Sequence, residues 1–222
     1  MNLRIIVDII DNMKEILYIF LGWFLGLFTK TIATRIESHY KRNSYKIAIF
    51  SELKNLSVRL CTTYYHIQQH LGKLDKSSLR WVKTMLEKYG GNEVYLKNIV
   101  DGINRLLQYP DNQLNSAIIS YNATETKYLT LKTFLLPFSV LIIDNISIFD
   151  SKFQRDILEV RTQISLLNEE IENAAFQSRL TFESSITVNN IDIIKANVKT
   201  TYIEIQNRCK FIVDKIDKIL QI

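Results

Sequence analysis

The sequence has little glycine, proline or cysteine. Six glycines and two prolines in 222 residues leave little material for tight turns, glycine-rich phosphate loops or a series of short strands. The two cysteines, Cys61 and Cys209, lie far apart and both fall within helical patterns, so we expect reduced, buried thiols rather than a disulfide. This composition favours long helices, and the fold class that it predicts is all-α.

The sequence also lacks the short motifs of common catalytic sites. It contains no nucleophile elbow, Walker loop, dinucleotide fingerprint or CxxC. His66 and His70 share one helix face at a spacing that lets two imidazoles reach one metal, but no third ligand with motif spacing accompanies them. Glu169, Glu170 and Glu172 flank a core position and are expected on a solvated face. We therefore predict no enzyme, no cofactor and no metal site.

One uninterrupted apolar stretch stands near the N-terminus. Residues 16–28, ILYIFLGWFLGLF, cover about 20 Å as a helix, less than the roughly 30 Å of a hydrocarbon core. Lys14 and Lys30 can extend their stems toward the interfaces, so the predicted span is residues 13–33. Apolar side chains surround the whole helix, which suits lipid better than a soluble core. No small-residue cleavage site follows Phe28, and we therefore predict an uncleaved anchor rather than a signal peptide.

A small-residue face runs along the predicted span. Gly22 and Gly26 form a GxxxG pair, and Thr29 and Ala33 continue that face at heptad-like spacing. Small residues let two helices approach closely, so the pattern predicts self-association of the span. The same spacing also arises by coincidence in apolar helices, and that alternative stays open here.

The cations around the span predict its orientation. Arg4 and Lys14 precede the span, and a larger set follows it, so the positive-inside rule places the C-terminal part in the cytosol, with the anchor in an inner membrane. Residues 1–110 carry a net charge of +7 and residues 111–222 a net charge of −2, as expected if the first half lies near anionic headgroups. The cations after the span are Lys30, Arg35, Lys41, Arg42 and Lys46.

The rest of the chain predicts one cytosolic helical domain. We place a membrane anchor with its basic segment at residues 1–43 and the domain at 44–222, with Asn43-Ser44 as the break between them. Glycine, proline and caps then divide the domain. The expected helices lie at 47–71, 77–89 and 92–108, with short helices within 111–123 and at 137–147. Residues 124–136 are expected to form an extended connection, or alternatively a lone strand.

The strongest pattern lies in the last third. Asp150 or Ser151 caps a helix with apolar residues at alternating steps of three and four, and a second such helix follows a loop at 184–189. Two helices joined in this way form an antiparallel hairpin over residues 150–222, about 50 Å long. The predicted hairpin core is Ile157, Val160, Ile164, Leu167, Ile171, Val198, Ile205 and Ile212.

The run from 136 to 168, LPFSVLIIDNISIFDSKFQRDILEVRTQISLLN, resembles a layout found in small bacterial proteins with one N-terminal span and a helical cytoplasmic domain. Some of these accompany anti-phage defence systems as membrane effectors. The resemblance rests on hydrophobic spacing and Pro137, and it implies a bacterial membrane effector without assigning a role to any residue.

Three hypotheses of function follow from the sequence. The first is a non-enzymatic membrane protein whose span self-associates and whose cytosolic domain binds a protein partner, acting as a membrane-perturbing effector. The second is a passive scaffold that holds a cytosolic complex at the membrane. The third is a membrane-tethered nucleic-acid binder, because residues 30–105 hold 14 cations against 6 acids with aromatic residues interleaved, although anionic lipid explains the same charges.

Overall fold

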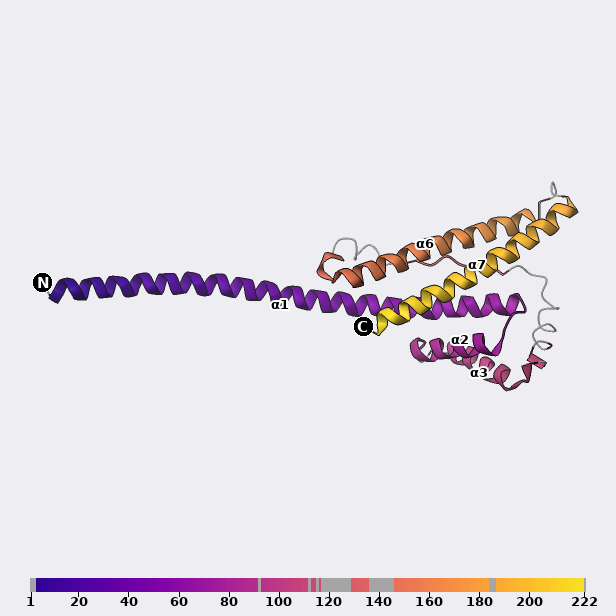
Figure 1. The fold of residues 1–222 in the computed structure, drawn as a ribbon, viewed down its shortest axis with the longest axis horizontal. Coiled ribbons are helices and arrows are strands. Elements are labelled where there is room, and N and C mark those ends of the chain that lie inside the picture. The colour runs from indigo at the N-terminus through magenta and orange to yellow at the C-terminus, as the bar shows by residue number, and fades with distance from the viewer. Residues whose placement is uncertain are drawn as a thin grey trace. The chain divides into compact units, whose positions relative to one another are not determined.

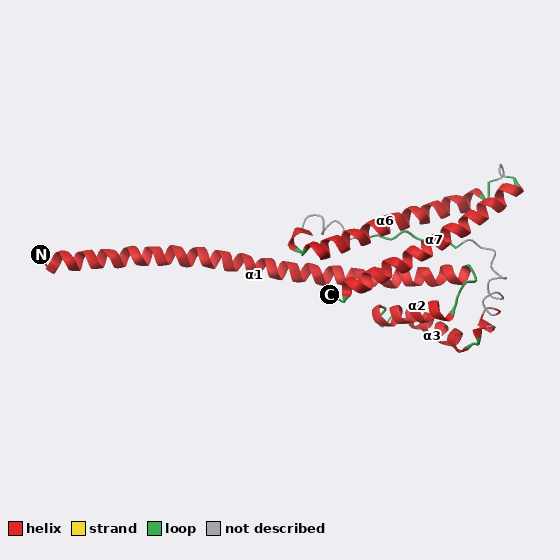
Figure 2. Cartoon of the chain, in the orientation of Figure 1, coloured by secondary structure: helices red, strands yellow, loops and turns green. Residues whose placement is uncertain are grey.

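The computed structural model of the chain is built from helices (Figures 1 and 2). It describes residues 3–91, 93–111, 113–114, 116, 129–135, 146–183 and 187–221. No strand occurs within these ranges, which confirms the predicted all-α fold. The chain divides into two compact units, Met1–Ile47 and Ala48–Ile222. The elements are α1 (Leu3–His70), α2 (Lys76–Tyr89), α3 (Val94–Gln108), a 3-10 turn η1 (Ile146–Ile148), α6 (Ser151–Leu180) and α7 (Val188–Leu220).

Helix α1 is continuous for 68 residues. It runs through Asn43 and Ser44, so the predicted break between them is wrong. The Asn43 side-chain nitrogen lies 3.2 Å from Nε2 of His39, one turn earlier, so its amide is satisfied along the helix instead of capping a new one. Since no glycine or proline lies between residues 27 and 71, nothing in the backbone forces the helix to end there.

The ends of α1, α2 and α3 fall at the residues that the sequence marks. After α1, Gly72 takes a φ of 65°, and the N–H of Lys73 donates to the carbonyl oxygen of Gln68 over 2.9 Å. Asp75 caps α2 by accepting the N–H of Ser78 over 2.6 Å. Helix α2 stops before Gly90, and α3 stops before Tyr109-Pro110. These ends confirm the predicted helix ends at 71, 89 and 108 to within a residue. The N-cap of α3 is Glu93, without a side-chain hydrogen bond, so the predicted start at Asn92 is wrong.

Helices α6 and α7 pack side by side and antiparallel (Figure 1), which confirms the predicted hairpin. Asp150 caps α6 by accepting the N–H of Phe153 over 2.9 Å. With 30 and 33 residues, the two helices are about 45 and 50 Å long. We call the buried line between them the hairpin seam. Its residues Ile157, Val160, Ile164, Leu167, Ile171, Val198, Ile205 and Ile212 are all at most 2% exposed.

The connection at residues 129–135, which precedes the hairpin in the sequence, lies against it without forming a helix or strand. Side chains of the hairpin hydrogen-bond to backbone groups of Leu129 and Phe134 in this connection. The amide of Asn168 both accepts the N–H of Phe134 (2.8 Å) and donates to its carbonyl oxygen (2.9 Å). These residues agree with the predicted extended connection. The rest of that connection, most of the short helices predicted at 111–123 and 137–147, and residues 184–186 of the predicted loop lie outside the described residues.

Helix α2 is fixed to the C-terminal half of α7 by polar contacts. The indole N–H of Trp81 donates to Asp214 over 3.0 Å. Lys88 and Tyr89 both donate to the carboxylate of Asp217, and the lysine contact is 2.6 Å. Burial, together with the hydrogen bond to this carboxylate, raises the pKa of Tyr89 to about 12, so the phenol stays protonated and keeps donating at neutral pH.

Replacing Ile164 with alanine should lower the free energy of unfolding by about 2–5 kcal/mol, because it removes a buried side chain from the middle of the hairpin seam and leaves a cavity. Ser165→Ala, at the exposed neighbouring position, is the matched control and should change it by less than about 0.5 kcal/mol. Urea unfolding of the full chain in detergent, followed by circular dichroism, measures both. Equal unfolding midpoints would contradict the packing described here.

Candidate functional site

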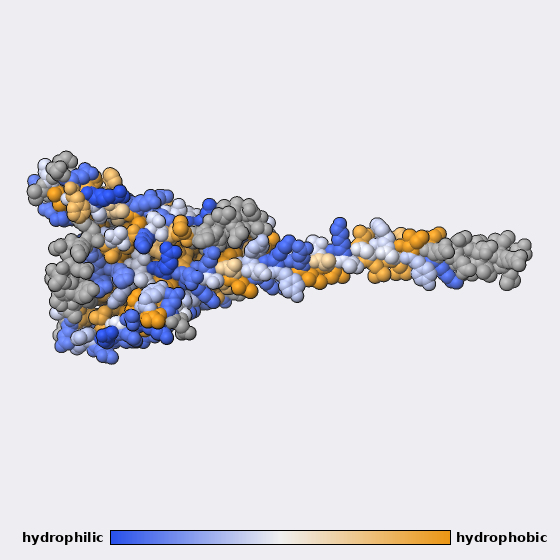
Figure 3. Space-filling model, turned by 180° about the vertical axis from the view of Figure 1, so that it is seen from behind, coloured by the Kyte–Doolittle hydropathy of each residue, from blue (hydrophilic) through white to orange (hydrophobic). Residues whose placement is uncertain are grey.

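The first candidate site is the apolar segment of α1. From Ile16 to Phe28 every large apolar side chain is between 47% and 73% exposed. Among the described residues, this is the helix that is long and apolar enough to cross a membrane, and none of its apolar window is buried. Figure 3 shows apolar side chains along the exposed part of α1. A core helix of a soluble domain would bury this surface, so the segment has the properties of a span rather than of a core element.

The small-residue face is open in this structure. A methyl group added to Gly22 or Gly26 would meet no atom within 4 Å. The hydroxyl of Thr29 donates to the carbonyl oxygen of Leu25 over 2.7 Å, and Thr31 does the same to Leu27 over 3.0 Å. Hydroxyls bonded within their own helix do not need water, which makes them compatible with a lipid environment. Ala33 is exposed beside them, so the four small residues lie along one accessible helix face.

The cations that follow the span lie along the next turns of α1. Lys30, Arg35, Lys41 and Arg42 are exposed and Lys46 is half-buried. Lys41 pairs with Glu37 over 2.6 Å, and the hydrogen bond between them lowers the pKa of Glu37 and raises that of Lys41. Both groups therefore stay charged at neutral pH. A helix carrying such cations just beyond an apolar segment suits the anionic surface of a bilayer.

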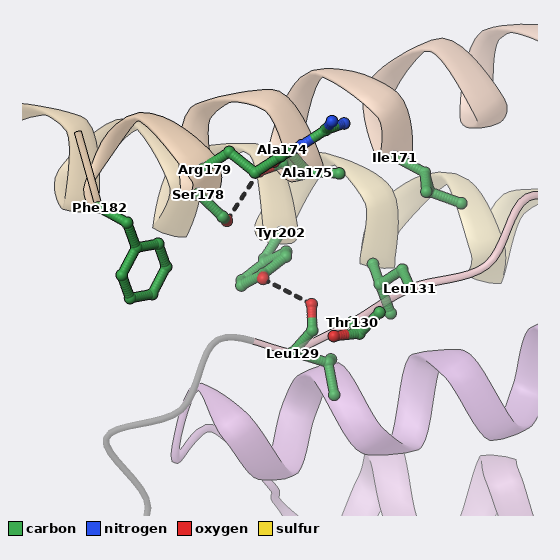
Figure 4. Close-up of a pocket in the computed structure, with 10 residues that line it drawn as sticks. All are labelled: Leu129, Thr130, Leu131, Ile171, Ala174, Ala175, Ser178, Arg179, Phe182 and Tyr202. Atoms are coloured by element: carbon green, nitrogen blue, oxygen red, sulfur yellow. Dashed lines mark hydrogen bonds between the residues drawn. The ribbon is translucent and has the colours of Figure 1, made fainter.

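The second candidate site is a groove of about 660 Å³ beside the hairpin seam (Figure 4). Ala174 occupies the end of the seam on α6, and its small side chain leaves this space open. Figure 4 shows Tyr202 reaching from α7 to the carbonyl oxygen of Leu129, and the hydrogen bond is 2.8 Å long. The hydroxyl of Ser178 donates to the carbonyl oxygen of Ala174 over 2.8 Å. The groove is lined by Leu129, Thr130, Leu131, Ile171, Ala174, Ala175, Ser178, Arg179, Phe182 and Tyr202.

The groove is suited to binding rather than to reaction. Its walls are mainly aliphatic and aromatic, and the polar atoms of Ser178 and Tyr202 are already engaged. Arg179 donates its Nε to the carbonyl oxygen of Ala175 over 3.3 Å at the exposed side of α6. Such a surface accommodates apolar side chains or an apolar segment of another molecule.

The three glutamates of α6 do not share one environment. Glu169 and Glu172 are exposed, as expected, but Glu170 is half-buried and paired with Arg208 of α7. Arg208 Nε lies 3.0 Å from both carboxylate oxygens, and its Nη1 donates to Gln163 over 2.7 Å. The expectation of a solvated face is therefore wrong for Glu170, because the residue stands directly beside the seam and faces the partner helix.

The histidines and thiols occupy structural positions. His66 is exposed, whereas His70 is half-buried with its ring edge-on to Tyr202, at 5.5 Å between ring centroids. In the part of the chain that the structure describes, no group of three or more His, Cys, Asp or Glu side chains gathers around a common point. Cys61 and Cys209 are both free and buried, which confirms the expectation for them, and burial raises the pKa of each thiol. Protonated, buried thiols are poor nucleophiles and poor metal ligands.

The fold is thus all-α, and the residues that the structure describes combine one helix long and apolar enough to cross a membrane with a bundle built on a helical hairpin. No protein-family model, curated protein or solved structure matches it.

Replacing Glu170 with alanine should lower the free energy of unfolding by about 1–3 kcal/mol, because the guanidinium of Arg208 would stay half-buried without its carboxylate. Glu169→Ala, the exposed neighbour, should change it by less than about 0.5 kcal/mol. Thermal unfolding of the full chain in detergent distinguishes the two. A stability loss of the same size for both variants would show that the pair does not contribute.

Proposed function

We propose that this protein is a non-enzymatic, single-span membrane protein that acts through contacts with the bilayer and with a protein partner. The observation that carries the proposal is the apolar segment of α1, whose side chains are exposed over its whole length. Burying that surface in lipid stabilises the protein, and leaving it in water is strongly unfavourable. The resemblance to small bacterial single-span proteins is consistent with this proposal.

The proposed orientation places the helical bundle in the cytosol of a bacterial cell with the anchor in the inner membrane. Its support is the set of exposed cations that follow the span, against Arg4 and Lys14 before it. The cations would then lie at the anionic inner surface of the membrane. In this arrangement the groove beside the hairpin seam is exposed to the cytosol and offers an apolar surface to a protein partner.

Within this function we favour a membrane-perturbing effector over a passive scaffold. The open face at Gly22 and Gly26 supports it, because spans that pack closely can assemble in the membrane, whereas an anchor needs no such face. The groove alone is equally compatible with a scaffold.

Replacing Phe20 and Phe24 with arginine should release the chain from membranes, because each arginine near the centre of a span costs about 2.5–3.5 kcal/mol on insertion scales. Ser38→Arg, beyond the predicted span, is the control and should leave membrane association unchanged. Extraction of membranes with alkaline carbonate measures both. The proposal would be overturned if the parent chain were itself extracted by carbonate.

Inducing the parent chain in bacteria should depolarise the inner membrane, as measured with a potential-sensitive dye, and Gly22→Ile with Gly26→Ile should abolish that effect. The two isoleucines hold the backbones of packed spans apart while adding apolar surface, so insertion is preserved. A chain that stays in the membrane and never changes its potential would favour the scaffold instead.

A further inference from the structure

The small-residue face of the span continues beyond the predicted membrane segment as an apolar stripe. Ile36, Tyr40 and Ile47 follow Ala33 on α1 and are 52%, 69% and 71% exposed. Their spacing keeps the alternating steps of four and three that begin at Gly22. We call this line the α1 seam. It consists of Gly22, Gly26, Thr29, Ala33, Ile36, Tyr40, Asn43 and Ile47.

The α1 seam lies on one unbroken helix. Helix α1 has no break at Asn43-Ser44, so the positions inside and outside the predicted span keep one helical phase. From Gly22 to Ile47 the seam covers about 38 Å at 1.5 Å per residue. It ends there because the next position, Phe50, lies 6.1 Å from the ring of Phe153 within the second unit. A repeat of alternating four and three steps over this length is the pattern of a coiled coil.

Charge is absent from the seam and present on both sides of it. Between residues 30 and 47 the chain carries six charged residues, and none of them occupies a seam position. The ion pair between Glu37 and Lys41 lies along the flank of the helix. In a lone helix exposed to water, nothing would keep charges away from one stripe. What distinguishes this stripe from the charge-free line of Thr31, Ser38 and Tyr45 is that it also carries exposed apolar side chains, which a partner helix could cover.

Asn43 is the polar exception in the seam outside the predicted span. In this structure its amide lies 3.2 Å from His39 on the same helix. Between two paired helices, an asparagine at this level is best accommodated opposite an identical asparagine that can share its hydrogen bonds. This feature favours a partner that presents asparagine at the same height.

We propose that the α1 helices of two copies of this chain pair in parallel and in register along the α1 seam, inside and beyond the membrane. This inference rests on the proposed function, since two copies inserted with one topology must lie parallel. A second copy of the chain is the partner that matches the whole seam. It presents small residues within the lipid, and it presents Ile36, Tyr40 and Ile47 beyond the lipid.

The flanking residues are compatible with that pairing. In a parallel, in-register pair, a residue just before every second seam position (Gly26, Ala33, Tyr40 and Ile47) in one helix faces the residue five positions later in the other helix. This places Leu25 opposite Lys30, Ile32 opposite Glu37, His39 opposite Ser44 and Lys46 opposite Ser51. No two like charges meet, so the electrostatics oppose neither the register nor the orientation.

Cysteine cross-linking tests the pairing in the full chain reconstituted in lipid vesicles. Under mild oxidation, Ile36→Cys and Ile47→Cys should form disulfide-linked dimers about tenfold more than Ser38→Cys, which is exposed but lies off the seam. The parent chain gives the background, because Cys61 and Cys209 are buried. Comparable cross-linking at Ser38→Cys would mean random collision and would overturn the inference.

A disrupting variant supplies the second arm. Ile36→Lys combined with Ile47→Lys should reduce dimers of Tyr40→Cys to background, whereas Thr34→Lys, off the seam, should not. Both seam residues are exposed, so the melting temperature of the bundle should stay unchanged. Retention of cross-linked dimers in the double lysine variant would refute the pairing. A carbonate-resistant chain that fails these tests contradicts the inference alone, whereas a carbonate-extracted chain contradicts the proposed function.

Discussion

The packing of α6 against α7 is the contact on which the rest of the second unit depends. Its seam residues are almost fully buried, and the elements that lie against the hairpin are attached to it by specific side chains. Asp214 and Asp217 of α7 hold α2, and Asn168 of α6 holds the connection at 129–135. Removing the hairpin would leave α2 and the connection without these polar partners.

Polar contacts across this hairpin align with its apolar seam. Glu170 directly precedes the seam residue Ile171, and Arg208 directly precedes the buried Cys209, on their own helices. Asp156 and Lys215 do the same before Ile157 and Ile216, and they pair over 2.9 Å. Burial of the seam side chains thus stabilises the packing of the two helices, and the flanking ion pairs favour one alignment of the helices over shifted ones.

The sequence predicted the helices and the hairpin because their signals are local. Gly72 and Pro110 end helices by backbone geometry alone, and the steps of three and four along α6 and α7 require only that one face be buried. The break at Asn43-Ser44 failed because capping residues permit a helix end without forcing one, and a side chain one turn away can satisfy the same amide. The pairing of Glu170 with Arg208 was also missed, although the position of both residues beside the seam was a usable signal.

The groove could not be predicted, because it depends on a segment with no periodic pattern. Its wall at Leu129 to Leu131 is held at Leu129 by Tyr202 of α7, and the same connection is held at Phe134 by Asn168 of α6, and both side chains are far from the connection in sequence. The small-residue face of α1 was predicted from the sequence, because the GxxxG motif depends only on the spacing of the two glycines. Its accessibility is a property of the fold and needed the structure.

The attachment of the connection to the hairpin has a further consequence. The phenol of Tyr202 bonds this wall of the groove at Leu129, and the amide of Asn168 holds the same connection further along, at Phe134, whereas the opposite wall is part of the tightly packed hairpin. Opening such a wall breaks a few polar contacts and leaves the seam intact, so it requires far less free energy than unfolding the bundle. The two sides of the groove therefore differ in how they are held: one is part of the hairpin, and the other is an irregular connection attached to it by single side chains.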